Sequence, residues 1–117
     1  MFNWKDFITL AEELVKQEDE ASLRTAIDRA YYGIFCTARD KAGLQEKKTK
    51  NVHMETVSFY NDAEDENKKY ISDGLDELRK YRNYASYDLN WSDINKNLAT
   101  LIVLKAKKIL EILEELK

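Results

Sequence analysis

The sequence predicts an all-α fold, an up-and-down bundle of four long helices and one short helix, in a single domain over residues 1–117. Three observations support this prediction. The 117 residues include no proline and only three glycines, whereas a turn-rich β fold needs many of both. Apolar residues recur at spacings of three and four, the period of a helix with one buried face. The single cysteine excludes a disulfide scaffold.

The first two helices have recognisable signals at their ends. The first is expected to begin near Asn3, a good N-cap residue with Asp6 in the capping-box position, and to end in the polar residues 16–19. The second is expected from Ser22 to Gly43, because glycine readily adopts the left-handed conformation that ends many helices. Both carry an apolar face, so both are predicted to pack against the core.

Polar segments surround a short third helix. The lysine-rich residues 44–51 are typical of an exposed loop, and the short helix is expected over residues 52–60. The acidic segment 61–66 is predicted to be a solvated loop rather than a site for a divalent ion. Its clustered carboxylates are Asp62, Glu64, Asp65 and Glu66.

A fourth helix is expected over residues 66–84, and the apolar positions 94–116 indicate a fifth. The break between them, residues 86–92, is rich in side chains that compete for backbone hydrogen bonds. Asn90 or Ser92 is predicted to be the N-cap of the last helix. Short loops favour antiparallel neighbours, and hence the up-and-down arrangement.

Composition and charge also limit function. No apolar run approaches the roughly 20 residues that span a bilayer, and the first six residues carry neither a basic leader nor a cleavage site. A cytoplasmic protein without membrane association is therefore expected. The net charge is −3, from 19 basic and 22 acidic residues, which excludes the broad basic surface of a generic nucleic-acid binder. Any nucleic-acid role must come from a local site.

The arginines are confined to the second helix and the end of the fourth. Lysine supplies a solvated point charge, whereas the planar guanidinium of arginine suits carboxylate, phosphate or aromatic partners. For Arg24 and Arg39, ordinary ion pairing is favoured, for example between Arg24 and Asp28 one turn away. The five arginines are Arg24, Arg29, Arg39, Arg79 and Arg82.

Arg82 lies on the apolar stripe of the fourth helix. It follows Ile71 by about three helical turns, so the two side chains point only about 20° apart around the axis. A buried guanidinium without a partner is very costly, so Arg82 must pair with a carboxylate or open into a polar cleft. Asp28 is the predicted partner, with Asp88 as the local alternative. A structural buried pair and a functional site are equally compatible with this position.

The second helix has an unusual face opposite its apolar stripe. Aromatic and sulfur side chains seldom gather on a solvent-facing surface, so this face is predicted to contact a partner, with a homodimer interface favoured. The alternative is that another helix of the same chain covers it. Gly33 and Gly74, inside helices two and four, indicate close packing of these helices around a polar site. The face carries Asp28, Tyr32, Phe35, Cys36 and Arg39.

No metal and no cofactor are expected. His53 is the only histidine and Cys36 the only cysteine, which leaves no recognisable zinc site. A helix-start or packing role is favoured for His53 over a general base, and a packing role for Cys36 over a nucleophile. The sequence contains neither a glycine-rich phosphate loop nor a serine nucleophile motif.

Two segments together resemble the signature of HEPN domains: Ala26–Phe35, with the sequence AIDRAYYGIF, and Leu75–Asp88. The resemblance covers nearly the whole chain in length and helix order. It implies a small α-helical bundle that is usually a homodimer. In many HEPN proteins an arginine, often followed by a polar residue, acts with a histidine four to six residues later as a metal-independent RNase site. Many members are toxins or defence nucleases, and several pair with a minimal nucleotidyltransferase antitoxin.

The residues of that site can be carried over one by one. Arg82 and Asn83 match the arginine and the polar residue, and Tyr87 stands where the family has histidine, so these three are the implied catalytic set. Tyrosine has an ordinary pKa near roughly 10, which suits it to hydrogen bonding or stacking on a base rather than to general-base catalysis. The binding residues expected around them are Arg79, Asp28, Arg29, Tyr32 and Asp88.

Three functions are compatible with these residues. The first is a metal-independent endoribonuclease, a toxin or defence component with a composite site across a homodimer. The second is a non-catalytic HEPN module that binds RNA, a nucleotide or a nucleotidyltransferase. The third is a purely structural dimeric bundle with a buried Arg–Asp pair. The pair Arg82 and Asn83 slightly favours the endoribonuclease.

Overall fold

The structure is a computed structural model that describes residues 1–46 and 50–116. Residues 47–49, part of the loop expected over 44–51, and residue 117 lie outside the described residues. In the described part the chain is helical and contains no strand, as the sequence predicts. Its elements are α1 (Lys5–Leu14), the 3₁₀ turn η1 (Val15–Gln17), α2 (Glu20–Lys41), α3 (Val52–Tyr60), α4 (Glu66–Tyr87) and α5 (Lys96–Glu115).

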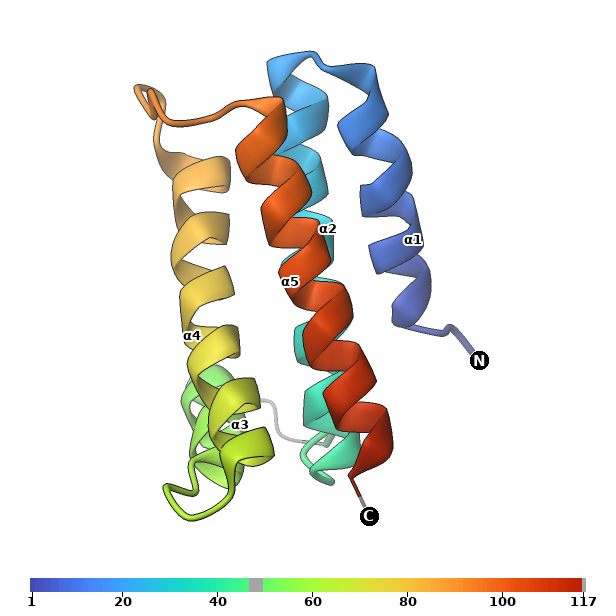
Figure 1. Cartoon of the computed structure of the whole chain (residues 1–117), viewed down its shortest axis with the longest axis vertical. Coiled ribbons are helices and arrows are strands. Elements are labelled where there is room, and N and C mark those ends of the chain that lie inside the picture. Colours follow the sequence, from blue (N-terminus) through green and yellow to red (C-terminus); the bar gives the residue numbers. More distant parts are fainter. Residues whose placement is uncertain (47–49, 117) are drawn as a thin grey trace.

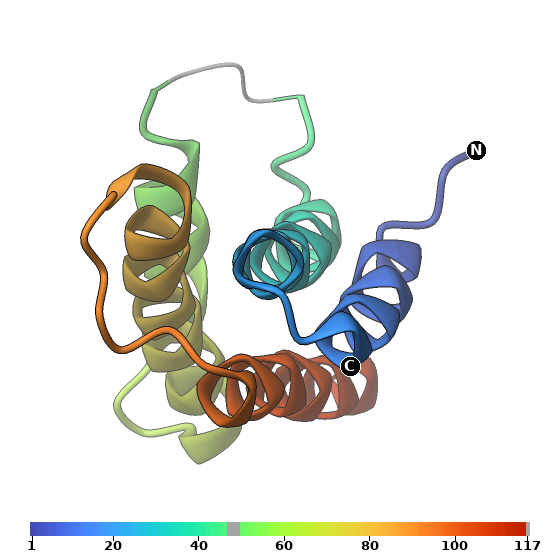
Figure 2. The same cartoon turned by 90° about the horizontal axis from the view of Figure 1, so that it is seen from above.

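The four long helices run alternately up and down, and the short α3 lies beside the first half of α4 (Figure 1). Seen along the helices, α2 occupies the middle and packs against α1, α4 and α5 (Figure 2). Within the described residues, no helix combines the length and apolar character needed to cross a membrane. Because α2 touches all the other helices, its residues contribute both to the core and to the polar site described below.

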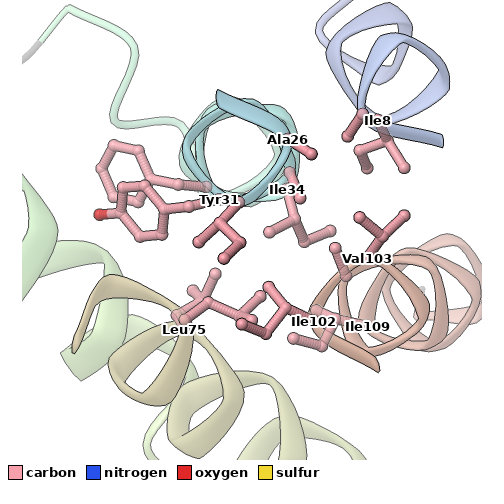
Figure 3. Packing of buried hydrophobic residues seen from close by; sticks show 14 of the residues in the cluster. Ile8, Ala26, Tyr31, Ile34, Leu75, Ile102, Val103 and Ile109 are labelled. Carbon is pink, nitrogen blue, oxygen red and sulfur yellow. The ribbon is translucent and has the colours of Figure 1, made fainter. Parts of the chain in front are cut away.

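The core lies between α2 and the helices around it. Figure 3 shows Ile8 of α1, Ile34 of α2, Leu75 of α4, and Val103 and Ile109 of α5 gathered there. All five are buried, and a fully buried side chain of this size contributes about 1.5–3 kcal/mol to folding. Small side chains between them let the backbones approach closely. These are Ala11, Ala26, Ala30, Ala38, Ala99 and Ala106, each 0% exposed.

The first two helices begin near the predicted residues, with small differences. Trp4 occupies the N-cap position of α1, one residue after the expected Asn3. The Asn3 side chain still accepts a hydrogen bond from the amide of Lys5 at 3.1 Å. The carboxylate of Asp19 accepts one from the amide of Ser22 at 3.0 Å, so α2 begins ahead of Ser22. A side-chain cap therefore sets the start of α2.

The break between α4 and α5 differs from the prediction at both ends. Helix α4 continues to Tyr87, one turn beyond its predicted end. The side chain of Asn95 accepts a hydrogen bond from the amide of Leu98 at 2.8 Å, so Asn95 is the N-cap of α5. The predicted caps Asn90 and Ser92 are wrong, because the first helical residue lies farther along the chain than either of them allows.

Gly43 ends α2, as predicted. Its φ of 77° lies in the left-handed region, which glycine adopts without steric cost. The amide of Gly43 donates to the carbonyl of Asp40, and the amide of Leu44 donates to that of Arg39, both at 3.0 Å. These two hydrogen bonds form a Schellman motif, which satisfies carbonyls that the end of a helix otherwise leaves open.

Gly33 and Gly74 do permit close helix contacts, but not the predicted contact. A Cβ added to Gly33 would lie 2.7 Å from Cγ1 of Ile8, and one added to Gly74 would lie 2.5 Å from Cδ1 of Ile109. Gly33 therefore marks the contact of α2 with α1, and Gly74 that of α4 with α5. The prediction that these glycines bring α2 and α4 together around a polar site is wrong.

The face of α2 predicted to contact a partner is partly covered within the chain. Phe35 and Cys36 are only 5% and 6% exposed. The ring of His53 on α3 stacks on Phe35, with centroids 5.6 Å apart. Burial raises the pKa of the Cys36 thiol, which agrees with the packing role expected for it. The prediction that these two side chains are open to a partner is wrong, because both are buried within the chain and α3 covers Phe35.

Candidate functional site

Arg82 of α4 pairs with Asp28 of α2, which confirms the predicted partner. Its Nε lies 3.4 Å from Oδ1 of Asp28, and the two side chains are 18% and 20% exposed. This Nε is itself buried and makes no hydrogen bond of good geometry with the described residues. On its Nε side the guanidinium therefore interacts with Asp28 through charge, and the Nε hydrogen has no hydrogen-bond acceptor among the described residues.

The carboxylate of Asp28 is shared by several donors. Its Oδ2 accepts two hydrogen bonds from Arg29, at 2.5 Å from Nη2 and 3.1 Å from Nε. Its Oδ1 accepts one from Oγ of Ser86 at 3.1 Å. Asp28 therefore faces two guanidinium groups, Arg29 and Arg82, and the cluster keeps an excess of positive charge.

Two further hydrogen bonds and two aromatic rings hold the guanidinium of Arg82, and one hydrogen on each Nη has no partner among these contacts. Nη1 donates to Oδ1 of Asn83 at 2.9 Å, and Nη2 donates to the hydroxyl of Tyr32. The guanidinium carbon lies 4.9 Å from the ring centre of Tyr32 and 5.5 Å from that of Tyr87, within the range of cation–π attraction. These contacts fix the plane of Arg82, and they bring Arg82, Asn83, Tyr87, Tyr32 and Asp28 together.

A pocket of about 230 Å³ opens beside Arg82, between α2, α3 and α4. We call it the Arg82 pocket. Arg79, one turn before Arg82, lines it, as does Lys50 from the segment ahead of α3. None of the described residues that line it is acidic, so the pocket suits an anion. Its lining residues are Tyr31, Tyr32, Phe35, Lys50, Val52, His53, Arg79 and Arg82.

His53 belongs to this pocket, although the sequence favours only a helix-start or packing role for it. It is 5% exposed. Its Nδ1 lies 2.6 Å from the hydroxyl of Tyr31, and its Nε2 lies 3.1 Å from Oδ1 of Asp76. Burial lowers the pKa of His53, and the hydrogen bond to Asp76 partly offsets this effect. No local spacing could have indicated this group, because its members come from α2, α3 and α4.

Tyr87 and Asp88 lie at the outer edge of the site. Tyr87 is 75% exposed, with its ring beside Arg82. The Asp88 carboxylate accepts a hydrogen bond from the amide of Asn90 at 3.0 Å, so it stabilises the turn after α4. It is not the partner of Arg82, the alternative that the sequence left open.

Arg24 contributes to the site indirectly. It pairs with Glu20 at 2.9 Å, not with Asp28 as the spacing suggested. Its Nη1 donates to three carbonyls at the end of α4, those of Tyr84, Ala85 and Asp88, at 3.4, 3.2 and 2.8 Å. One guanidinium therefore ties α2 to the end of α4, where helix carbonyls otherwise lack partners.

The arrangement offers anion binding rather than metal binding. Among the described residues, no three His, Cys, Asp or Glu side chains lie close enough together to hold a metal ion. The acidic residues 62–66 form no such group either. In comparisons with known proteins, no family model, curated protein sequence or solved structure matches this chain.

Proposed function

We propose that this chain is a HEPN-like protein that binds RNA at the Arg82 pocket and cleaves it without a metal ion. The observation that carries the proposal is the setting of Arg82. Its guanidinium borders a pocket that also holds Arg79 and Lys50, and the carboxylate that pairs with it, Asp28, is shared with Arg29. Such a cationic pocket suits the phosphates of RNA, and the aromatic rings beside it suit the bases.

In this mechanism the 2′-hydroxyl of the substrate attacks the neighbouring phosphate, and a cyclic phosphate forms. Negative charge builds up on the phosphate oxygens in the transition state, where Arg82 and Arg79 stabilise it. Asn83, which accepts a hydrogen bond from Arg82, orients the phosphate. The exposed ring of Tyr87 stacks on a base of the substrate.

The active form in this proposal is a homodimer in which two Arg82 pockets face each other. Exposed apolar side chains at the end of α4 support a contact there, since Tyr84, Tyr87 and Leu89 are 41%, 75% and 88% exposed. Sedimentation equilibrium tests the dimer. A species of twice the 13.8 kDa chain mass is expected, and a monomer at all micromolar concentrations contradicts it.

A role as a toxin or defence component in the cytoplasm, with a minimal nucleotidyltransferase as partner, follows from the same HEPN resemblance. Expression in a host cell tests it, because the wild type should slow growth and Arg82→Ala should not. Equal growth of the two strains contradicts the toxin role.

The experiment that tests the proposed function is an RNA cleavage assay in EDTA, with wild type and Arg82→Ala. We expect the variant to lose at least about 100-fold in rate, because a donor to transition-state charge is removed, while its helical circular dichroism is kept. Arg39→Ala is the matched control. Arg39 also pairs with an aspartate, lies over an aromatic ring and is 20% exposed, but it does not line the pocket. No cleavage by wild type, or equal losses in both variants, contradicts the proposal.

A non-catalytic RNA-binding module is the second candidate. Two features favour it: Asp28 and Tyr32 already engage Arg82, and tyrosine stands at the histidine position of the family motif. Tight binding of a 2′-O-methyl RNA without cleavage of the matching RNA supports this candidate over the endoribonuclease. The absence of both binding and cleavage favours the structural bundle.

A further inference from the structure

A chain of three side chains reaches the Arg82 pocket from the side of α3. The Asp76 carboxylate contacts Nε2 of His53 at 3.1 Å, and Nδ1 of His53 contacts the Tyr31 hydroxyl at 2.6 Å. The Asp76 side chain is 64% exposed, whereas Tyr31 is buried and lines the pocket. The Arg82 guanidinium lies 6.0 Å from the Tyr31 ring. In Figure 3 this ring lies on the side of α2 away from α1. The chain therefore joins solvent to the pocket.

The order of donors along this chain follows from the groups themselves. A carboxylate can only accept, so the hydrogen of the imidazole lies on Nε2. Burial lowers the pKa of His53 and favours the neutral ring, which leaves Nδ1 as an acceptor. The Tyr31 hydroxyl therefore donates to Nδ1, and the lone pairs of its oxygen stay available to a ligand in the pocket.

The charges around His53 favour the neutral ring but leave one counter-ion in place. Two guanidiniums of α4 lower the pKa of His53, and Asp76 raises it. Burial raises the pKa of Tyr31, which keeps its hydroxyl protonated. The titratable and charged groups around this part of the pocket are Asp76, Arg79 and Arg82 on α4, Tyr31 and Tyr32 on α2, Lys50 ahead of α3, and Glu55 on α3 itself.

We propose that Tyr31 accepts the proton of the attacking 2′-hydroxyl, and that His53 and Asp76 are positioning residues that draw the proton away. The inference rests on the RNA cleavage proposed above and deepens it. Tyr87 is unsuited to act as a general base, and in this proposal Tyr31 of α2 and His53 of α3 transfer the proton instead. Tyr31 is then a catalytic residue, because its oxygen contacts the substrate hydroxyl.

Atoms and electrons balance in this step. The O–H bond of the 2′-hydroxyl breaks as its oxygen bonds to phosphorus, and the proton moves to the Tyr31 oxygen. The hydrogen of the Tyr31 hydroxyl moves to Nδ1 of His53, and Asp76 stabilises the imidazolium. The bond from phosphorus to the 5′ oxygen breaks with its electron pair, and that oxygen takes a proton from water. The hydroxide formed then receives the extra proton of His53.

The first test is Tyr31→Phe, which removes the hydroxyl and keeps the ring. We expect kcat for RNA cleavage to fall by at least about 100-fold, the usual contribution of proton transfer, while binding of a 2′-O-methyl RNA is unchanged. Tyr60→Phe is the matched control. Tyr60 is also buried, and its hydroxyl donates to the carbonyl of Ala38 at 2.8 Å, away from the pocket lining. A wild-type rate in Tyr31→Phe overturns the inference.

The second test is Asp76→Asn, with Asp73→Asn as its control, since the two side chains are 64% and 63% exposed on the same helix. We expect Asp76→Asn to lower kcat by less than about tenfold at constant KM, because the imidazolium loses a solvent-exposed counter-ion. The acid limb of the pH profile should move to lower pH, because Asp76 raises the pKa of His53. A purely structural role for Asp76 leaves that limb in place, and such a result overturns its part in the relay.

The hydrogen-bond order can also be measured without substrate. Nitrogen-15 NMR of the single histidine should place its hydrogen on Nε2, with an Nδ1 shift that changes in Tyr31→Phe. A hydrogen on Nδ1 overturns the relay whether or not RNA is cleaved. Cleavage that needs Arg82 but not the Tyr31 hydroxyl overturns the relay alone, whereas no cleavage by wild type overturns the proposed function together with the relay.

Discussion

At the scale of the residue, Asp28 controls the charge of the Arg82 pocket. Its two oxygens accept hydrogen bonds from Arg29 and Ser86 and pair with Arg82, so one negative charge is shared between two guanidinium groups. A ligand phosphate competes with Asp28 for Arg82. The carboxylate therefore orients Arg82 in the free protein and weakens its attraction for an anion at the same time.

Asp28→Asn should separate these two effects. The amide keeps one acceptor oxygen but loses the charge and turns an NH2 group toward donors, so the free energy of unfolding should fall by about 1–3 kcal/mol. The loss of the charge should also tighten the binding of 2′-O-methyl RNA. Urea denaturation and fluorescence anisotropy measure the two quantities. Asp40→Asn is the control, because Asp40 pairs with Arg39 outside the pocket lining. Weaker RNA binding in Asp28→Asn contradicts this account.

His53 should make stability depend on pH. Its pKa in the folded chain lies below its ordinary value of 6.5, because burial disfavours the charged ring. The unfolded chain therefore binds a proton more readily. Stability should be complete above pH 6.5 and fall as the pH drops from there toward the lower folded value. Urea denaturation at pH 7.5 and 5.5 checks this, and His53→Gln should reduce the difference. An equal difference in the variant assigns the pH dependence to other groups.

At the scale of the element, the end of α4 is held by a residue of α2. Arg24 supplies donors to the last carbonyls of α4, and the helix continues through Ser86 to Tyr87. The local sequence favours a break there, since asparagine and serine compete for backbone hydrogen bonds. A contact between residues far apart in the chain overrides that local preference, which explains why the sequence predicted too short a helix.

Arg24→Ala should loosen the last turn of α4. The carbonyls of Ala85 and Asp88 lose their donor, so we expect a loss of about 1–2 kcal/mol in the free energy of unfolding and faster amide exchange over residues 84–88. RNA cleavage should fall too, because Tyr87 lies in this turn. Arg24→Lys should lose less free energy of unfolding than Arg24→Ala, since lysine keeps a charged donor although it lacks the planar guanidinium. Unchanged exchange in Arg24→Ala contradicts the capping role.

The predictable features are those written in local patterns. The spacing of apolar residues predicted five helices in the right order, and Gly43 predicted the end of the second. The position of Arg82 on the apolar stripe of the fourth helix indicated that it pairs with Asp28. The group of Tyr31, His53 and Asp76 could not be found in this way. Its members lie on three helices, and the packing of α3 against α4 and α2 brings them together.

At the scale of the whole molecule, α1 and α5 close one side of α2, and the polar pocket opens on the other. The two interior glycines both belong to the closed side. A Cβ at Gly33 would meet Cγ1 of Ile8 at 2.7 Å, and it would also meet the backbone carbonyl of Trp4 at 3.1 Å. At Gly74 the nearest atoms belong to the side chain of Ile109. Backbone yields less easily than the end of a side chain.

Gly33→Ala and Gly74→Ala should therefore change the free energy of unfolding by different amounts, and the two changes can have opposite signs. Alanine gains about 1 kcal/mol over glycine inside a helix. At Gly74 a rotation of Ile109 can make room, so the net change should be small. At Gly33 the extra methyl pushes the backbone of α1 away from α2, and the overpacking should cost about 1–3 kcal/mol. Urea denaturation of both variants measures the difference. A larger loss of stability in Gly74→Ala contradicts this reasoning, and it means that α4 and α5 tolerate an added methyl group less well than α1 and α2 do. RNA binding should survive in both variants, because neither glycine lines the Arg82 pocket.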